Sequence, residues 1–343
     1  MRVGIVGAGN IGRVHARTVL ACERTTLAGL YDIDADRARE AAGELGVPAF
    51  ASLEELCAAA EGVVVASPNR THAAHALAVL DHGRHVLCEK PMAVSLAEAA
   101  AMRERAAASP VTAGVGFNYR YLPVVRAVRE RVDDGRLGRV LHADLAFKRA
   151  SALTRRHFTW RDGAAERSTS GALGDLGVHL LDLLHFLFRS PVDTGACQVA
   201  LRTKVGTKGG RPVEVDDHAF VSGRLHTGPH FTLTASKAST PDDVGLSLTL
   251  TGTRGELAYH SRDGSLLLER TGVDWEPVKL LGPARLDDPP GEVPGWADSF
   301  LDQLLDWTSA ARGGTGGTLA GFEDGRLAQQ VLEDLLGRAG RAS

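Results

Sequence analysis

The chain contains 343 residues, and 44% of them are hydrophobic, so it is long enough for two domains and apolar enough to bury their cores. A formal net charge of −3 argues against the broad basic surface that nucleic acid requires, and the apolar runs stop short of the ~18 residues of a membrane span. We therefore expect neither nucleic acid nor a membrane as a partner.

The four cysteines are scattered along the chain and include no C-x-x-C pair. Such a pattern disfavours both a disulfide scaffold and a structural zinc site. We therefore expect a reducing, cytoplasmic environment for this protein.

The beginning of the chain has the order that a dinucleotide-binding unit requires. Apolar runs at 3–6 and 27–31 predict buried parallel strands, and a helix is expected over 12–21. The first strand and the helix are joined by G-A-G-N-I-G, a G-x-G-x-x-G loop that allows a tight turn, close approach of a pyrophosphate and close helix packing. The residues predicted to hold the dinucleotide are Gly7, Gly9, Asn10, Ile11, Gly12 and, at the end of the second strand, Asp32.

Asp32 also predicts which nicotinamide cofactor is used. Its carboxylate can accept hydrogen bonds from the adenosine ribose hydroxyls, and it would repel a 2′-phosphate. Ile33 offers no basic partner for such a phosphate, although Arg37 lies near enough in sequence to leave NADP open. We expect NAD rather than NADP.

Strands and helices continue to alternate up to residue 120. The further strands are expected at 63–66, 85–88 and 111–117, and the further helices at 34–45, 52–60, 71–82 and from Ser95. Alternation with short connections predicts a doubly wound parallel sheet, which we assign to residues 1–120. Ligands bind beyond the carboxyl ends of such strands, where this chain has its polar tripeptides at 67–69, 89–91 and 118–120.

Residues 172–188 are expected to form a helix that is apolar nearly all round and therefore buried. Asp175, His179 and Asp182 follow one another at i, i+4 and i+7, so they share one face. Because burying ionisable groups without partners is costly, they either pair in the core or face a cleft. A carboxylate at 175 can fix the tautomer of the His179 imidazole and raise its basicity, which favours a general base. We interpret Asp182 and His185 as structural.

The order of these motifs resembles the glucose-fructose oxidoreductase, inositol dehydrogenase and MocA (Gfo/Idh/MocA) family of NAD(P)-dependent oxidoreductases. The matching segments are Gly7 to Gly12, Pro68-Asn69 with His72, Glu89-Lys90-Pro91, Asn118-Tyr119-Arg120, Trp160-Arg161, Gly171 to Asp182 and Phe322 to Gly325. The resemblance implies that Lys90, Asp175 and His179 are catalytic. Only six of the 39 basic side chains are lysines, and Lys90 is the only lysine in the first 147 residues, which agrees with a retained role.

The same resemblance implies further contacts to cofactor and substrate. Cofactor contacts are expected from Ser67, Pro68, Asn69, His72, Glu89 and Lys90. Substrate contacts are expected from Lys90, Asn118, Arg120, Trp160, Asp175 and His179. The family often has three consecutive glycines before the catalytic aspartate, where this chain has Gly171-Ala172-Leu173-Gly174. The helix entry is expected to be kept, but substrate approach at this point is open.

Residues 121–343 are expected, from the resemblance, to form an α+β domain on an open, mainly antiparallel sheet that binds substrate and packs against a partner subunit. Alternating segments that fit such a sheet lie at 140–147, 219–225, 231–235, 246–251 and 256–259. An exposed sheet face of this size favours a homodimer or homotetramer.

The combined prediction is an NAD-dependent dehydrogenase that interconverts a secondary hydroxyl and a ketone. His179 would be the base, Asp175 would orient it, and Lys90 would stabilise charge on the substrate oxygen. The substrate stays open among sugars, cyclitols, amino sugars including aminoglycosides, and sugar nucleotides, and the basic stretch at 148–157 is interpreted as an acid-paired surface rather than a phosphate site.

Two alternatives belong to other classes of protein. The first is a non-catalytic NAD-binding sensor or regulator on the same fold. The second is a metal site, and it is disfavoured because no carboxylate set accompanies its candidate ligands, which are His72, His75, His82 and His85.

Overall fold

The structure, a computed structural model, describes residues 1–163, 169–280 and 284–339. Spatial contacts divide it into two compact units, Met1–Tyr121 with Ala297–Gln329, and Leu122–Trp296 with the residues from Gln330 onward. The sequence-based division at residue 120 assigned residues 297–329 to the second domain, whereas the structure packs them on the first unit. An amphipathic helix carries no local sign of which distant sheet it will cover.

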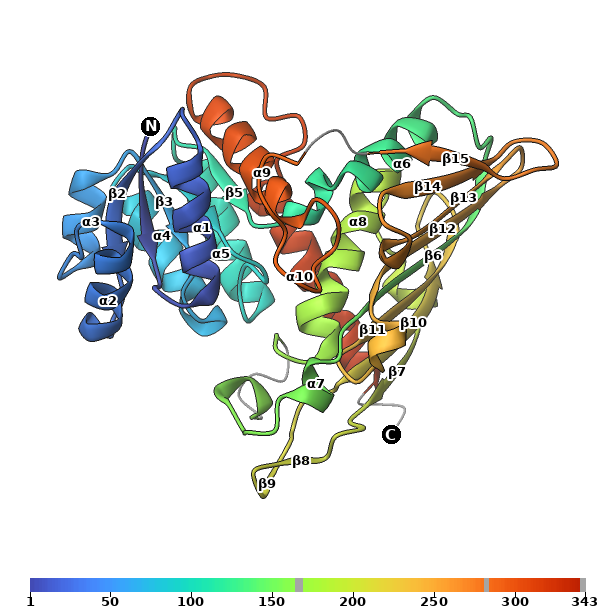
Figure 1. Ribbon diagram of the computed structural model, residues 1–343, viewed down its shortest axis with the longest axis horizontal. Coiled ribbons are helices and arrows are strands. Elements are labelled where there is room, and N and C mark those ends of the chain that lie inside the picture. Colours follow the sequence, from blue (N-terminus) through green and yellow to red (C-terminus); the bar gives the residue numbers. More distant parts are fainter. Residues whose placement is uncertain (164–168, 281–283, 340–343) are drawn as a thin grey trace. The chain divides into compact units, whose positions relative to one another are not determined.

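The first unit is built on a five-stranded parallel sheet with strand order β2-β1-β3-β4-β5. Its strands are β1 (Arg2–Val6), β2 (Thr26–Tyr31), β3 (Gly62–Val65), β4 (His85–Cys88) and β5 (Ala113–Val115). The connecting helices flank the sheet (Figure 1) and are α1 (Asn10–Ala21), α2 (Ala35–Leu45), α3 (Leu53–Ala59), α4 (His72–Asp81) and α5 (Leu96–Ala107). The predicted doubly wound parallel sheet is confirmed.

Polar side chains fix where three of these helices begin. Asp34, Ser52 and Ser95 each accept a hydrogen bond from the backbone amide three residues further on, at 3.1–3.2 Å. Each bond satisfies an amide that the first turn of a helix leaves without a partner. The predicted helix starts at Ser52 and Ser95 are confirmed.

Two helices from the end of the chain are α9 (Trp296–Ala311) and α10 (Phe322–Ala339). Trp307 of α9 is fully buried against Gly62 of β3, where a Cβ atom would lie 2.8 Å from the indole ring. Gln303 of the same helix donates a hydrogen bond to the Val115 carbonyl of β5 at 3.2 Å. These contacts make α9 part of the core of the first unit.

The second unit is built on an eight-stranded sheet with strand order β15-β14-β13-β12-β6-β11-β10-β7. Its strands are β6 (Val140–Lys148), β7 (Gln198–Arg202), β10 (His218–Arg224), β11 (His230–Ser236), β12 (Gly245–Gly252), β13 (Glu256–His260), β14 (Leu266–Arg270) and β15 (Glu276–Lys279). The neighbouring strands are antiparallel except β6 and β11, which are parallel. The predicted mainly antiparallel sheet is confirmed.

Several smaller elements of the second unit were not predicted from the sequence. They are α6 (Pro123–Asp133), α7 (Ser151–Thr154) and a hairpin of β8 (Thr207–Lys208) and β9 (Arg211–Pro212), together with the sheet strands β7, β14 and β15. The hairpin strands are too short to show an alternating pattern.

The helix predicted over 172–188 consists of a π-helical segment, η5 (Leu173–Gly177), followed by α8 (Val178–Phe188). Both pack on one face of the eight-stranded sheet (Figure 1), where Leu145 and Phe147 of β6 are buried. Asp175 thus lies in a π-helical turn rather than in a regular α-helix, and His179 lies on the first turn of α8. In the described part of the chain, no helix is long and apolar enough to cross a bilayer.

The burial of Trp307 generates a prediction about stability. Trp307→Ala should lower the free energy of unfolding by ~3–5 kcal/mol, because it leaves a cavity between α9 and the parallel sheet. The matched control is Trp275→Ala, since Trp275 is 40% exposed and stacks with Arg270 at the surface. We expect the control to change stability by at most ~0.5 kcal/mol. Chemical denaturation measures both, and equal effects would contradict the assignment of α9 to this core.

Candidate active site

The loop between β1 and α1 has the geometry of a phosphate cradle. Gly7 adopts a φ of +98°, and a Cβ atom there would lie 2.6 Å from the Ala66 carbonyl oxygen. A Cβ atom at Gly12 would lie 1.9 Å from the Gly7 carbonyl oxygen. Gly9, by contrast, has open space around its Cα, and no acidic residue occupies the first turn of α1. The amides at this helix start can therefore face an anion at close range, so Gly7 to Gly12 fit a dinucleotide pyrophosphate.

Asp32, at the end of β2, is fixed against this loop. Its carboxylate accepts hydrogen bonds from Ala8 N at 2.8 Å and Asp34 N at 2.9 Å, and its side chain is 9% exposed. Arg37 lies 3.6 Å from Asp32 and 3.0 Å from Asp34. The Arg37 guanidinium is thus shared by two carboxylates, which lowers its capacity to attract a ribose 2′-phosphate.

The segments that follow β3 and β4 are held together by His72. Its Nδ1 lies 2.9 Å from the Pro91 carbonyl oxygen and its Nε2 lies 2.8 Å from that of Ser67. Burial lowers the pKa of His72. Ser67 also bonds His75, while Pro68 leads into the short 3-10 helix that Asn69 begins. These contacts fix the two predicted cofactor-facing segments relative to each other.

Glu89 forms a buried pair with His15 immediately before Lys90. The Nε2 of His15 lies 2.7 Å from Glu89 Oε1, and Glu89 Oε2 accepts a hydrogen bond from Lys90 N at 3.1 Å. Burial raises the pKa of Glu89, but the hydrogen bond and charge of His15 outweigh it, so this pKa lies below its usual value. His15 was not predicted from the sequence, where its only signal is its place one turn after Gly12. Glu89 thus anchors the Lys90 backbone to α1.

Asn118 and Arg120 contact helices from the end of the chain. Asn118 Nδ2 donates to Ser299 Oγ at 2.8 Å, and Arg120 pairs with Asp324 at 3.0 Å. Both side chains are about 95% buried, with 3% and 5% of their surface exposed. These contacts favour a role in attaching α9 and α10 to the first unit, in addition to the substrate contact that the motif predicts.

In the second unit, Asp175 has a partner that the sequence analysis missed. Its Oδ2 lies 2.7 Å from Lys237 Nζ, and Lys237 also donates to the Ser170 carbonyl at 2.7 Å. The Asp175 side chain is 33% exposed and that of Lys237 is 13% exposed. His179, on the first turn of α8, is buried with its ring 6.3 Å from that of Phe147. Lys237 follows β11 directly, and no local pattern points from it to Asp175.

Asp216 fixes the start of the helix that carries Asp175. Its carbonyl oxygen accepts a hydrogen bond from Ala172 N at 2.8 Å, and its carboxylate accepts one from Leu173 N at 2.9 Å. A Cβ atom at Gly171 would lie 1.9 Å from the Asp216 carboxylate. This contact therefore requires glycine at position 171, and the expected helix entry is kept.

A pocket of about 200 Å³ opens beside Asp175. Its charged lining consists of Arg155, Arg161, Asp162, Asp175, Lys208, Asp216, Asp217 and Lys237. Trp160 is 37% exposed next to this lining, and the Arg161 guanidinium stacks over its ring at 4.5 Å. The predicted residues Asp175 and Trp160 therefore belong to the same part of the second unit.

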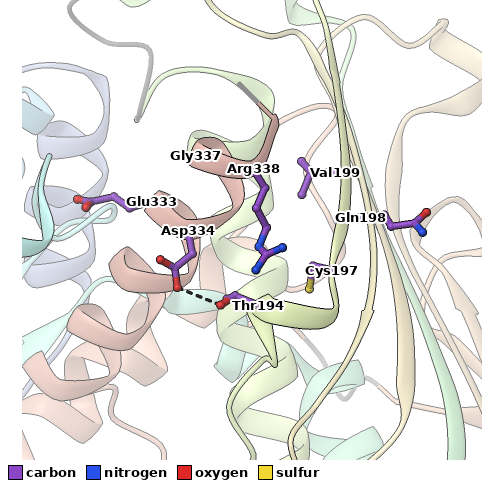
Figure 2. Close-up of a pocket in the computed structure, with 8 residues that line it drawn as sticks. All are labelled: Thr194, Cys197, Gln198, Val199, Glu333, Asp334, Gly337 and Arg338. Carbon is purple, nitrogen blue, oxygen red and sulfur yellow. Dashed lines mark hydrogen bonds between the residues drawn. The ribbon is translucent and has the colours of Figure 1, made fainter. Parts of the chain in front are cut away.

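A larger pocket of about 690 Å³ lies where the end of α10 meets β7 (Figure 2). It is lined by Thr194, Cys197, Gln198, Val199, Glu333, Asp334, Gly337 and Arg338. Thr194 and Asp334 are joined by a hydrogen bond of 3.0 Å, and burial raises the pKa of the Cys197 thiol to about 11. No predicted site residue lines this pocket, and its thiol is held in the unreactive protonated form.

Three of the four histidines of the metal alternative have other partners. His72 contacts two carbonyls, His75 bonds Ser67, and His85 accepts a hydrogen bond from Thr112 N at 2.9 Å. Among the residues that the structure describes, no three His, Cys, Asp or Glu side chains gather as metal ligands would. The described geometry thus gives the metal alternative no support.

The similarity to known proteins extends over nearly the whole chain. Residues 1–117 match a family model described as an oxidoreductase family with an NAD-binding Rossmann fold, and residues 125–258 match the GFO/IDH/MocA C-terminal domain. Glucose-6-phosphate 3-dehydrogenase of Bacillus subtilis is 40% identical over 334 residues, which cover 97% of this chain and 94% of that protein. Inositol 2-dehydrogenase 2 of Paenarthrobacter aurescens is 29% identical, with 98% and 95% covered.

Solved structures agree with these matches. An oxidoreductase domain protein from Kribbella flavida has a TM-score of 0.88 and 27% identity, with 99% of this chain and 97% of that chain covered. Levoglucosan dehydrogenase in complex with NADH and L-sorbose has a TM-score of 0.88 at 23% identity, covering 100% and 97%, which shows a common fold. The prediction of an NAD-dependent oxidoreductase is confirmed and is favoured over the sensor alternative. The chain belongs to the Gfo/Idh/MocA family of NAD-binding oxidoreductases.

Proposed function

We propose that this enzyme oxidises a ring hydroxyl of a hexose 6-phosphate to a ketone with NAD+, and that it catalyses the reverse reduction. The observation that carries this proposal is the 40% identity to a glucose-6-phosphate 3-dehydrogenase along 97% of the chain. The inositol dehydrogenase relative is 29% identical, so a hexose phosphate is preferred over a cyclitol.

The proposed cofactor site lies on the first unit. The amides of Gly9 to Gly12 would bind the pyrophosphate, and the Asp32 carboxylate would accept hydrogen bonds from the adenosine ribose. Ser67, Pro68, Asn69 and the His72-anchored backbone would line the nicotinamide side together with Glu89 and Lys90. When bound, NAD+ supplies the hydride acceptor.

The proposed chemistry uses His179, Asp175 and Lys90. His179 takes the proton of the reacting hydroxyl, and Asp175 stabilises the imidazolium that results. Lys90 donates a hydrogen bond to the same substrate oxygen and stabilises its developing negative charge. Asn118, Arg120 and Trp160 would complete the substrate contacts. The Lys237 ammonium, 2.7 Å from Asp175, forms an ion pair with that carboxylate.

Absorbance of reduced nicotinamide tests the proposed function directly. The purified enzyme is mixed with NAD+ and, in separate reactions, with glucose 6-phosphate, glucose and myo-inositol. Turnover with glucose 6-phosphate at the highest kcat/KM supports the proposal. A higher kcat/KM with myo-inositol or glucose contradicts it.

We also propose that the protein works in the reducing cytoplasm. Its four cysteines are free and buried, and burial raises the pKa of both Cys57 and Cys197 to about 11. Buried thiols that stay protonated do not readily form disulfides.

Finally, we propose a homodimer or homotetramer built on the second unit's sheet. Alternate residues of β10 are buried, whereas Phe220 between them is 40% exposed, and Leu268 of β14 is 37% exposed. A broad sheet face that carries exposed large apolar side chains is a typical subunit contact.

The cofactor preference generates a prediction at Asp32. Asp32→Ala should lower the ratio of kcat/KM for NAD+ over NADP+ by about 10–100-fold, because it removes charged hydrogen bonds to the ribose and the repulsion of a 2′-phosphate. Asp36→Ala breaks the exposed Asp36–Arg39 pair on the nearby helix α2 and should leave the ratio unchanged. A wild-type enzyme that prefers NADP+ would overturn this interpretation of Asp32.

The catalytic proposal generates a prediction at Lys90. Lys90→Arg should reduce kcat by about 10²-fold or more while NAD+ affinity, measured by calorimetry, changes little, because a guanidinium lacks the compact ammonium geometry. Lys279→Arg, at an exposed position of β15, is the matched control and should retain full activity. If Lys90→Arg keeps most of the activity, Lys90 is not the catalytic lysine.

The assembly proposal is tested by light scattering at micromolar concentration. The wild-type enzyme should have the mass of a dimer or tetramer, and Phe220→Asp should shift it toward monomer by placing a charge on the sheet face. Val273→Asp, a change at an apolar residue that is 88% exposed in a loop, should not shift it. A monomeric wild-type enzyme excludes the proposed assembly.

A further inference from the structure

The pocket beside Asp175 contains two cations that share one carboxylate. Arg155 and Lys208 both donate to Oδ1 of Asp162, at 2.5 Å and 2.8 Å. Only 4% of the Lys208 side chain and 2% of the Asp162 side chain are exposed, whereas Arg155 is 27% exposed. Lys237, in the same pocket, has its own carboxylate in Asp175. The Asp162 group of three therefore carries a surplus positive charge.

Asp162 is already saturated with donors. Besides the two cations, its Oδ2 accepts hydrogen bonds from Thr159 N at 2.8 Å and Thr159 Oγ1 at 2.9 Å. Burial raises the pKa of Asp162, but these hydrogen bonds and charges outweigh it and hold the pKa at about 2. Asp162 is thus ionised at neutral pH and fixed in place, so it neutralises one cation and not both.

Two other aspartates that line the pocket accept hydrogen bonds from backbone amides. Asp217 accepts hydrogen bonds from the backbone amides of Lys204 at 2.8 Å and Val205 at 2.7 Å. Asp216 accepts one from Leu173 N, and burial raises its pKa. Arg161, whose guanidinium stacks on Trp160, adds a further cation next to Asp162. Arg155 and Lys208 therefore share the Asp162 carboxylate as their common partner, and Arg161 is a further cation of the same lining.

This arrangement differs from the rest of the basic stretch that begins at Lys148. Lys148 pairs with Asp243 at 2.9 Å, and Arg149 pairs with Glu292. Those two cations form the acid-paired surface that the sequence predicted. Of Lys148, Arg149 and Arg155, only Arg155 lines the pocket. There it shares the pocket lining with Lys208, one of only six lysines in the chain.

We propose that Arg155, Lys208 and Arg161 form a subsite for the phosphomonoester of the substrate, which we call the phosphate subsite. The inference rests on the proposed function, in which Asp175 acts at the reacting hydroxyl. The pocket lined by Asp175 has a volume of about 200 Å³, which is large enough for a phosphate group. The phosphate would bind there at some distance from the carbon that is oxidised. Guanidinium and ammonium groups are the donors that proteins use for phosphate oxygens.

Steady-state kinetics of Arg155→Met with NAD+ tests the subsite. Arg155→Met should raise KM for glucose 6-phosphate by about 10–100-fold, as expected for loss of a charged hydrogen bond, while kcat/KM for glucose stays within about twofold of wild type. Arg224→Met is the matched control, because Arg224 forms an exposed pair with Asp193 at 2.9 Å and lies outside the pocket. It should leave both substrates unaffected.

Inorganic phosphate gives a readout that does not depend on turnover. Phosphate should bind the wild-type enzyme in calorimetry and compete with glucose 6-phosphate, and both effects should weaken at least tenfold in Arg155→Met and in Lys208→Met. Thermal melts establish whether each variant is folded. If Lys208→Met does not fold, Arg155→Met, at the more exposed position, is sufficient for the test.

The outcomes separate the subsite from the proposed function. Phosphate binding that is lost in the variants supports the subsite even if glucose 6-phosphate is not turned over, a result that would refute only the hexose phosphate assignment. Equal losses for glucose and glucose 6-phosphate would assign Arg155 a structural role and overturn the subsite. Unchanged phosphate binding and unchanged KM in both variants would also overturn it.

Discussion

The ion pair of Asp175 and Lys237 is the interaction on which the arrangement of the second unit's site depends. Asp175 is an ionisable residue in a helix whose other side chains are almost all apolar, and it needs a compensating charge nearby. Lys237 supplies that charge from the end of β11, at 2.7 Å. Since the Lys237 ammonium is also held by the Ser170 carbonyl, the same contact fixes the chain just before the helix. Asp175, in the π turn, lines the pocket, and His179 is buried on the first turn of α8.

The elements that could be predicted from the sequence are those with a local signal. The G-x-G-x-x-G loop, the caps Ser52 and Ser95 and the alternating strands depend on residues only a few positions apart. The missed features are non-local. Lys237 is far from Asp175 in sequence, and the packing of Trp307 on β3 joins the two ends of the chain. The π turn was missed because a run of apolar residues does not distinguish it from an α-helix.

Asn118 and Arg120 belong to a motif whose residues can serve for ligand contact, for attachment of a helix, or for both. Both belong to a segment that matches the family, and both are bonded to helices near the end of the chain, to Ser299 and Asp324. These two polar contacts therefore add to the apolar contact of Trp307 in attaching the helices from the end of the chain to the first unit. A sequence signature alone cannot separate residues that touch a ligand from residues that attach a helix, because both restrict the side chain equally.

The group of Arg155, Lys208 and Asp162 is unfavourable as a purely structural device. Two cations that converge on one carboxylate oxygen repel each other, and the repulsion is strongest where Lys208 and Asp162 are withdrawn from water. Sites that bind an anion tightly are destabilised while they are empty, because the groups that attract the ligand repel one another until it arrives. The proposed phosphate would give Arg155 and Lys208 a second anionic partner beside Asp162.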